Sequence, residues 1–203
     1  MCVYVSKNKN NAYFRSDKII IQKLDMERIK LHDKYFKPFI TNDTIEANIE
    51  KVAQKISVDY KEVDKPLFLS VLNGSFMFTA SLMKKIDLIA DISFIKLASY
   101  EGTASTGNVR ELIGINEDIT GRSVIIVEDI VDTGSTIEEL HTILKARGVA
   151  DIRVCTLFLK PESYSKPFPI DYPAMEIGNE FIVGFGLDYN HLGRQYKDIY
   201  VID

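Results

Sequence analysis

The sequence has few cysteines and no excess of basic charge. Only Cys2 and Cys155 occur among its 203 residues, which is too few for a disulfide framework and favours a reducing compartment. Lysine and arginine number 25 against 29 aspartates and glutamates, which gives a formal net charge of −4. No basic field is therefore available to recruit nucleic acid or a membrane surface. A bound polyanion would have to be held locally, by backbone dipoles, a metal or a few placed cations.

Long hydrophobic runs are missing as well. No apolar stretch approaches the ~18 residues that a membrane-spanning helix requires. The first 25 residues hold one short apolar block, Ile19 to Ile21, which is too short for the core of a signal peptide. The histidines are scattered, and no metal-ligand spacing links them. We therefore expect a soluble, cytoplasmic protein with no membrane or nucleic-acid partner.

The length and composition fit one globular domain with a small appendage. Residues 1–25 are polar and irregular, and the periodic pattern begins at Met26. Two interpretations stay open. These residues form a poorly packed N-terminal arm, or Met26 is the biological start and the preceding residues are a mis-assigned reading frame. Residues 26–203 are expected to form the domain.

Helical and strand-like patterns alternate along this domain. Apolar residues recur at helical spacing from Ile45 to Ile56, behind a cap at Thr41 to Asp43. Short apolar runs, such as Ser123 to Glu128, suit strands buried on both faces. The sequence predicts helices over 45–56, 76–88 and 135–147, and strands over 67–72, 92–97, 123–128, 152–159 and 181–187. This alternation indicates an α/β domain with a largely parallel sheet.

Residues 99–120 break the pattern. The part from Ser99 to Asn108 is small, polar and glycine-bearing, which is typical of a mobile loop. Residues 109–115 could form a strand on one side of this loop. Long loops in compact domains are usually functional lids or disordered segments.

The stretch 124–136 carries the strongest chemical signal. A buried strand ends in Glu128 and Asp129, a third carboxylate follows at Asp132, and a small turn then opens a helix. In open α/β sheets, ligands bind beyond the carboxyl ends of the strands. The turn 133–136 offers backbone N–H groups and three hydroxyls at a helix N-terminus, an arrangement that suits a phosphate.

The acids beside this turn narrow the choice of ligand. They would repel a phosphate unless sugar hydroxyls, a divalent metal or both offset their charge, so the pattern favours a sugar phosphate. Ser135 and Glu138 also form the S-x-x-E pattern of a capping box. No Walker sequence is present. The alternative is a strand, a turn and an ordinarily capped helix with solvated acids.

The stretch 124–136 resembles the 5-phosphoribosyl-1-pyrophosphate (PRPP) binding motif of type I phosphoribosyltransferases. Further blocks look like those of the hypoxanthine-guanine phosphoribosyltransferases: a first pyrophosphate-binding loop at 72–75, the start of a flexible loop at 99–100, and a purine-binding tail at 181–194. The resemblance runs from about Met26 to the C-terminus. It implies an α/β fold with a mainly parallel twisted sheet flanked by helices, and a small hood built from N- and C-terminal segments. The lid would span about 99–120, and the purine-binding part of the hood about 160–203.

The activity that this resemblance implies is purine salvage. The enzyme would transfer the 5-phosphoribosyl group from PRPP to N9 of a 6-oxopurine, giving IMP from hypoxanthine and GMP from guanine, with release of pyrophosphate. Mg²⁺ would neutralise the charge of the leaving pyrophosphate. Because the ribose becomes oxocarbenium-like, water must be excluded, and the loop 99–108 is the candidate lid. Family members usually form homodimers or homotetramers, so we expect a homo-oligomer.

The resemblance also implies roles around the base. Asp132 would be the general acid/base at purine N7, and Lys160 would donate to O6. A buried ammonium that faced adenine's amino group would be unpaired, so Lys160 favours 6-oxopurines. Phe181 would stack on the purine, Ile182 would offer backbone groups to the Watson–Crick edge, and Asp188 would hold the Mg²⁺ carried by pyrophosphate.

The remaining implied contacts involve the sugar and its phosphates. Glu128 and Asp129 would bind the ribose hydroxyls and, through those hydroxyls, could also contact the metal. The 5′-phosphate would be bound by Thr133, Gly134, Ser135 and Thr136. The pyrophosphate would be bound by Asn73, Gly74, Ser99, Tyr100 and Arg194. Judged by sequence position alone, several of these residues could have ordinary structural roles instead. Lys160 could be a surface lysine, Phe181 a core aromatic, and Asp188 and Arg194 solvated charges.

The first loop departs from the family pattern. Many relatives carry a lysine where this sequence has Asn73, and in the family the peptide entering this position can be cis. Asn73 and the small Gly74 would allow backbone contacts to pyrophosphate. The lysine side-chain contact, and subunit coupling through this loop, do not carry over.

Two rival functions remain at this stage. One is a regulator of the same fold that senses PRPP and binds nucleic acid, which the net charge of −4 disfavours. The joint presence of Lys160, Phe181 and Asp188 also argues against a pure sensor. The other rival is a transferase that prefers another base. Lys160 disfavours adenine, but it does not decide between hypoxanthine, guanine and xanthine.

Overall fold

The computed structural model describes residues 27–98 and 110–203, except for the side chains of residues 98 and 110–112. The expectations for residues 1–25, for Ser99 and Tyr100 and for the loop that they begin lie outside the described residues. Within the described part of the chain, no helix is long and apolar enough to cross a membrane.

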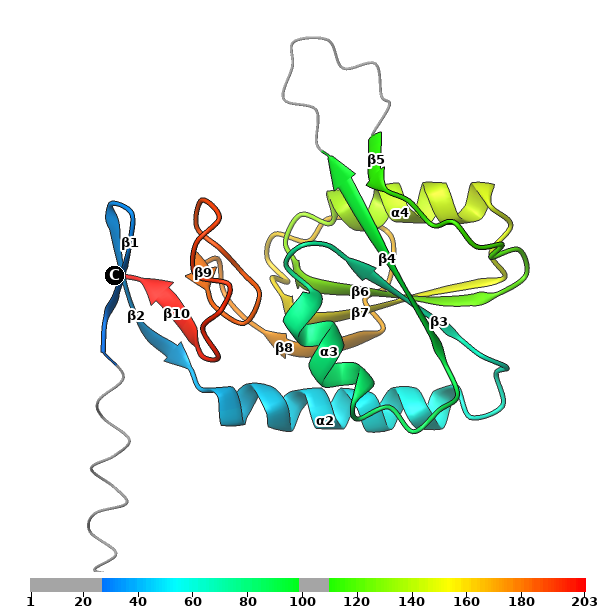
Figure 1. Cartoon of the computed structure of the whole chain (residues 1–203), viewed down its shortest axis with the longest axis horizontal. Coiled ribbons are helices and arrows are strands. Elements are labelled where there is room, and N and C mark those ends of the chain that lie inside the picture. The colour runs from blue at the N-terminus through cyan, green and yellow to red at the C-terminus, as the bar shows by residue number, and fades with distance from the viewer. Residues whose placement is uncertain (1–26, 99–109) are drawn as a thin grey trace, which may run out of the picture.

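A six-stranded sheet forms the centre of the molecule (Figure 1). Its strand order is β5-β4-β3-β6-β7-β8, and all neighbouring strands are parallel except the antiparallel pair β4 and β5. The strands are β3 (Leu67–Val71), β4 (Asp91–Ala98), β5 (Arg110–Ile113), β6 (Ser123–Val131), β7 (Asp151–Leu159) and β8 (Tyr172–Glu176). Every residue of β3 is buried, because helices cover both faces of a parallel sheet.

The covering helices divide the interior into two cores. The helices α2 (Asn42–Asp59) and α3 (Phe76–Met83) lie on one face of the sheet, and α4 (Ser135–Ala146) lies on the other (Figure 1). Side chains alternate along β3, so that Phe68 packs with α2 and α3 while Leu67 and Leu69 pack with α4. The free thiol of Cys155 in β7 is buried in the first core, as expected for a small core residue.

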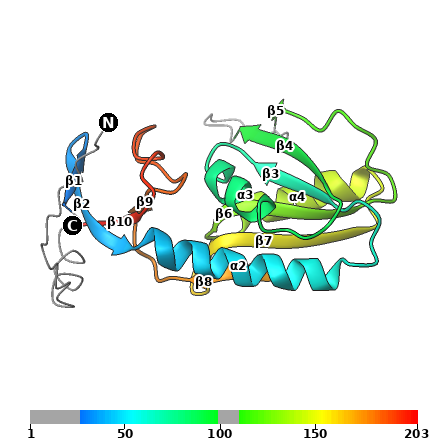
Figure 2. The same cartoon turned by 60° about the horizontal axis from the view of Figure 1, so that its bottom comes forward.

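A second, smaller sheet stands at one end of α2 (Figure 2). It is antiparallel with the order β1-β2-β10-β9. Its strands are β1 (Ile29–Leu31), β2 (Lys34–Ile40), β9 (Ile182–Val183) and β10 (Ile199–Ile202). The N- and C-terminal segments therefore build one unit, which we call the hood. The Asp198 carboxylate accepts the backbone N–H of Asn42 at 2.7 Å, and this contact joins the hood to the first turn of α2.

Most of the predicted elements are present with bounds that differ by a few residues, and three of these differences have a clear structural cause. The predicted helix 76–88 ends at Met83, because the N–H groups of Lys85 and Ile86 both bond to the Leu82 carbonyl and the chain turns back towards β4. The strand predicted to end at Glu128 continues to Val131, since β7 still pairs with it there.

The third difference concerns the late strand. The predicted strand 181–187 is only Ile182–Val183. Gly184, Phe185 and Gly186 all have positive φ, at 104°, 46° and 103°, and this backbone region is incompatible with a strand. The segment instead turns sharply out of the hood sheet.

Candidate active site

The predicted site residues gather at one edge of the central sheet. Strands β3, β6 and β7 are neighbours and parallel, so their carboxyl ends meet at the same edge. Asn73 and Gly74 follow β3, the turn 132–136 follows β6, and Lys160 follows β7. Segments that are far apart in sequence thus converge where an open α/β sheet binds its ligands.

Lys160 and Asp132 form an ion pair at this edge. The backbone N–H of Lys160 donates to the Val131 carbonyl at 2.9 Å, and its Nζ lies 3.1 Å from Asp132 Oδ2. The Lys160 side chain is 11% exposed and that of Asp132 is 48% exposed. A lysine ammonium has three donors, so Lys160 can hold Asp132 and a ligand oxygen together, while the carboxylate stays accessible.

Two buried carboxylates lie within β6. Burial and the neighbouring charge of Asp129 raise the pKa of Glu128 well above its usual value. Burial raises the pKa of Asp129 to about 6, although the Ile130 N–H donates to its Oδ1 at 3.0 Å and opposes this shift. The two carboxylates are neighbours in the chain, and each lies in the last part of β6, before the turn 132–136. Glu128 Oε2 is buried and has no hydrogen-bond partner among the described residues, which makes it an acceptor available to a ligand hydroxyl.

The loop after β3 packs closely against Asp129 and the tail of the chain. A Cβ at Gly74 would overlap all three atoms of the Asp129 carboxylate. The Gly74 carbonyl in turn contacts Gly186, where a φ of 103° and the lack of room for a Cβ require glycine. The peptide between Leu72 and Asn73 is cis.

A buried hydroxyl network supports this loop from beneath. Ser75 Oγ donates to the Val71 carbonyl at 2.6 Å and lies 2.8 Å from Ser70 Oγ. Ser70 Oγ also lies 2.8 Å from Thr79 Oγ1 in α3. These hydroxyls satisfy one another inside the core, and they fix the loop relative to β3 and α3.

The turn 133–136 opens α4 differently from the predicted capping box. Gly134, with a φ of 84°, is the N-cap residue, and no side-chain cap bond is made there. Ser135 is the first helical residue, so its hydroxyl bonds to Thr133 Oγ1 at 3.1 Å, and Glu138 pairs with Lys166 Nζ at 2.6 Å. The capping-box prediction was wrong because glycine occupies the cap. The first-turn N–H groups keep no intrahelical partner, which leaves a cradle for an anion.

Phe181 and Ile182 lie in the hood. The Phe181 ring is 45% exposed and lies 6.3 Å from that of Phe36 and 5.8 Å from that of Tyr189, between ring centroids. The Phe181 carbonyl accepts the Ile202 N–H at 3.0 Å. Since bonded and non-bonded pairs alternate in an antiparallel ladder, the N–H and C=O of Ile182 point away from β10, at the edge of the hood sheet.

Arg194 and Asp188 form a second ion pair. Arg194 Nη2 lies 2.5 Å from Asp188 Oδ1, and its Nη1 donates to the Gly186 carbonyl at 2.6 Å. Because Gly186 contacts Gly74, this pair lies beside the loop after β3. Consistent with that position, the charge of Arg194 lowers the pKa of Asp129 and the charge of Asp188 raises it.

The family model described as "Phosphoribosyl transferase domain" matches residues 40–190. The chain belongs to the phosphoribosyltransferase family. The hypoxanthine-guanine phosphoribosyltransferase of Streptococcus pyogenes serotype M3 is 45% identical over 149 residues, which cover 73% of this chain and 82% of the relative. That of Streptococcus agalactiae serotype V is 41% identical over 154 residues, covering 75% and 85%.

Solved structures agree with these sequence relatives. A Trypanosoma cruzi hypoxanthine phosphoribosyltransferase, a lysine-to-arginine mutant complexed with the product IMP, superposes with a TM-score of 0.77 at 35% identity over 86% of this chain and 93% of that one. The asparagine mutant from an analysis of an invariant aspartic acid in HPRTs gives 0.77 at 37% identity, over 82% and 92%. The fold is therefore the type I phosphoribosyltransferase fold, as expected.

The donor set of this phosphoribosyltransferase fits a magnesium ion that arrives with its substrate. Mg²⁺ is usually bound through one or two carboxylates together with substrate phosphates. Asp129 and Asp188 lie close enough for the charge of one to shift the pKa of the other. Within residues 27–98 and 110–203, no group of three or more His, Cys, Asp or Glu residues is placed to hold a metal. A metal cage made of protein alone is therefore absent from this part of the chain.

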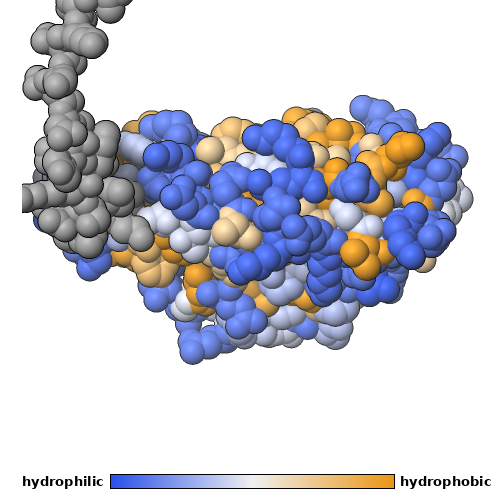
Figure 3. Space-filling view, turned by 90° about the horizontal axis from the view of Figure 1, so that it is seen from below, coloured by the Kyte–Doolittle hydropathy of each residue, from blue (hydrophilic) through white to orange (hydrophobic). Residues whose placement is uncertain are grey.

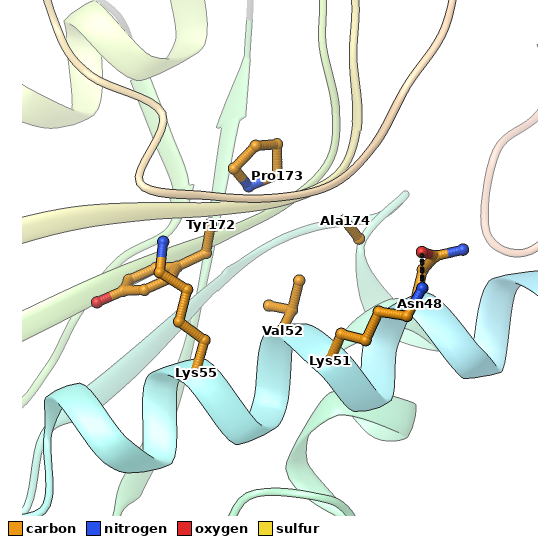
Figure 4. Close-up of a pocket in the computed structure, with 7 residues that line it drawn as sticks. All are labelled: Asn48, Lys51, Val52, Lys55, Tyr172, Pro173 and Ala174. Carbon is orange, nitrogen blue, oxygen red and sulfur yellow. Dashed lines mark hydrogen bonds between the residues drawn. The ribbon is translucent and has the colours of Figure 1, made fainter.

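A groove between α2 and β8 lies away from this site. It is lined by Asn48, Lys51, Val52, Lys55, Tyr172, Pro173 and Ala174 (Figure 4). These residues belong to α2 and to the amino-terminal half of β8, whereas the site lies at the carboxyl ends of the strands. The face that carries α2 is mostly hydrophilic, with scattered apolar patches (Figure 3). We assign the chemistry to the strand ends, because the carboxylates and Lys160 converge only there among the described residues.

Sequence reasoning missed several residues of this phosphoribosyltransferase site. Gly186 supports the loop after β3, Ser75 anchors it, and Lys166 lies next to the cap of α4. The G-x-G pattern at 184–186 was a signal for a tight turn. Lys166 gave no comparable signal, because its partner Glu138 is distant in sequence. The partners of Ser75, Val71 and Ser70, are close in sequence, but a lone serine after a strand does not show that its hydroxyl is buried and bonded.

Proposed function

We propose that the chain transfers the 5-phosphoribosyl group from PRPP to N9 of hypoxanthine and of guanine, in purine salvage. The products are IMP or GMP and pyrophosphate. The relatives support this proposal by their names, and the T. cruzi structure supports it by its complex with IMP. The regulatory sensor and the xanthine-preferring enzyme are not favoured by these comparisons.

The observation that carries the proposal is the ion pair between Asp132 and Lys160. A 6-oxopurine presents N7 and O6 side by side on one edge. A carboxylate and an ammonium 3.1 Å apart match that edge, because the carboxylate can exchange a proton with N7 while the ammonium donates to O6. In this role Asp132 is the general acid/base, and Lys160 selects 6-oxopurines over adenine.

The sugar and its 5′-phosphate bind along β6 and the start of α4. Asp129 and Glu128, whose Oε2 has no partner among the described residues, accept the ribose 2′- and 3′-hydroxyls. The N–H groups and hydroxyls of Thr133, Gly134, Ser135 and Thr136 bind the 5′-phosphate, and the positive end of the α4 dipole stabilises it.

The hood supplies the contacts to the purine. The exposed face of Phe181 stacks on the ring, a type of contact worth ~1–3 kcal/mol. The outward N–H and C=O of Ile182 bond to the Watson–Crick edge of the base. Within residues 27–98 and 110–203, no further strand lies beside this edge strand in the hood, so its backbone groups are available to a ligand.

The pyrophosphate lies near Arg194 and the loop after β3. Arg194 and the backbone of Asn73 and Gly74 bind the leaving group, and Asp188 holds Mg²⁺ that enters with it. When bound, this ion supplies positive charge to the leaving pyrophosphate. Arg194, which the Gly186 carbonyl already orients, donates to oxygens of the pyrophosphate. The contribution of Ser99 and Tyr100, as part of a lid that excludes water, stays a prediction because both lie outside the described residues.

The protein also acts as a homo-oligomer under this proposal. Phe76, Ile92 and Phe94 are 43%, 44% and 40% exposed. Ile92 and Phe94 pair with Phe68 and Ser70 of β3, which face α3, so these apolar side chains lie on one side of the sheet. Exposed apolar surface of this kind marks an association site. Light scattering should give a dimer or a tetramer for the wild type and a smaller species for Phe94→Asp. A wild-type monomer would contradict this part of the proposal.

A cytoplasmic location completes the proposal, supported by the reduced, buried Cys155 and by the few cysteines of the sequence.

The central experiment measures nucleotide formation from PRPP and Mg²⁺ with hypoxanthine, guanine, xanthine, adenine and uracil side by side. We expect turnover of hypoxanthine and guanine well above that of adenine and uracil. Saturable PRPP binding without turnover of any base would instead support the regulatory sensor.

A further inference from the structure

Lys166 lies against the cap of α4, next to the cradle formed by residues 133–136. A Cβ placed on Gly134 would lie 2.9 Å from Lys166 Cγ. The ammonium of Lys166 pairs with Glu138 Oε2 at 2.6 Å, in the first turns of α4. Tyr164 packs on the same side of Gly134, but its hydroxyl already donates to the Phe168 carbonyl at 2.5 Å. Of these two side chains, Lys166 is therefore the one whose polar group, the ammonium, can leave its present partner and bind a ligand.

The electrostatics of the cradle call for such a cation. Asp132 immediately precedes it and Glu138 follows it, and a phosphate monoester adds a charge of about −1.5 to −2 at neutral pH. The helix dipole supplies the equivalent of only about half a positive charge. Lys160 is already paired with Asp132, and the proposed function assigns its remaining donors to the base.

We propose that Lys166 is a further PRPP-binding residue, which leaves Glu138 and donates to the 5′-phosphate when that group enters the cradle. This inference rests on the proposed function, because it assumes that the cradle binds the 5′-phosphate. Three rotatable bonds follow Cγ in a lysine side chain, so the ammonium can move while the stem stays packed on Gly134. Lysine serves as a point charge at phosphate sites. In the free protein, Glu138 keeps the ammonium beside the cradle.

Two variants separate this role from a purely structural one. Lys166→Met and Glu138→Gln both remove the ion pair, but only the first removes the cation. We expect Lys166→Met to raise the KM for PRPP by about tenfold or more, with the KM for hypoxanthine unchanged. Glu138→Gln should leave the KM for PRPP unchanged or lower it, because Lys166 is then free to bind. Lys145→Met, an exposed lysine in the last turn of α4, is the matched control and should behave as wild type.

Binding of ribose 5-phosphate, measured by calorimetry on the same proteins, provides a readout that does not need turnover. Lys166→Met should weaken this binding and reduce its dependence on salt. Equal weakening in Lys166→Met and Glu138→Gln would overturn the inference, because the ion pair would then act only as a structural tie. An unchanged Lys166→Met, or a wild type that binds no ribose 5-phosphate, would also overturn it. A wild type that binds ribose 5-phosphate through Lys166 but converts no base would overturn the proposed function alone.

Discussion

Replacing Gly74 by alanine tests whether the site depends on the position of the Asp129 carboxylate. The new methyl group would overlap all three carboxylate atoms, so Asp129 must move. The φ of Gly74 lies outside the left-handed region, and alanine therefore adds volume without backbone strain. Displacing the carboxylate also takes it away from the ribose hydroxyl that it is proposed to accept. A hydrogen bond to a charged group is worth about 1.5–3 kcal/mol, which corresponds to a factor of about 10 to 150.

We expect Gly74→Ala to raise the KM for PRPP by a factor in this range, since the proposed partner of Asp129 is a ribose hydroxyl. Initial rates at varied PRPP and saturating hypoxanthine measure it. Gly121→Ala is the control. Its φ of 72° disfavours alanine, but no described atom lies within 4 Å of the added Cβ, so it should lower Tm and leave the kinetics unchanged. A Gly74→Ala protein with the KM and kcat of the wild type would refute the reasoning.

Three further predictions follow from the same site. Asp132→Asn should lower kcat by about 10²- to 10⁴-fold with little change in Tm, as expected for loss of a general acid/base; wild-type turnover would remove Asp132 from that role. Lys160→Ala should raise the KM for hypoxanthine by about 10- to 150-fold, through loss of a charged hydrogen bond, and unchanged kinetics would contradict the O6 assignment. The pKa of Asp129, raised from 3.8 to about 6, means that the folded protein binds this proton more tightly than the unfolded chain. Stability of the ligand-free protein should therefore fall by about 3 kcal/mol as the pH rises from about 4 to above 6. Urea unfolding should show this fall in the wild type and a smaller one in Asp129→Asn, and equal pH dependence in both would count against it.

The central sheet could be predicted from the sequence because its strands are buried on both faces. Leu67–Val71 and Ser123–Val127 are mostly apolar, with one serine each. The first is followed by the short apolar helix α3 and the second by α4, a helix with one apolar side. The order of these elements by itself predicts that the turn 133–136 lies at a strand end. Asn73, Gly74, Asp132 and Lys160, which the structure brings to this edge, were accordingly among the predicted residues.

The hood could not be predicted from local pattern. Its strands β1, β2 and β10 mix exposed and buried residues, as in Lys34–Ile40, and they pair across almost the whole chain. Only the resemblance to the phosphoribosyltransferases implied a unit built from both terminal segments. The strand expected at 181–187 failed for a different reason: its apolar residues favoured a strand over the turn that Gly184 and Gly186 signal, and the positive φ at Phe185 lies between those two glycines.

Contacts between segments that are distant in sequence could not be predicted either. The sequence pattern S-x-x-E favoured Ser135 as a cap, but Gly134 occupies that position because Tyr164 and Lys166 fill the space where a larger residue's Cβ would be. Glu138, which the capping box would have used, instead pairs with Lys166. A local signal was overruled by a tertiary contact.

The hood sheet pairs strands that are far apart in the sequence, and this affects the order in which parts of the protein can fold during synthesis. The carbonyl of Phe181 accepts the backbone N–H of Ile202, and among the described strands β9 pairs with β10 alone. During synthesis, β3, β6, β7 and α4 can emerge and assemble while this part of the chain is still being translated. The part of the site proposed to bind the sugar phosphate can then form early, whereas the part proposed to bind the base depends on the later pairing of β9 with β10.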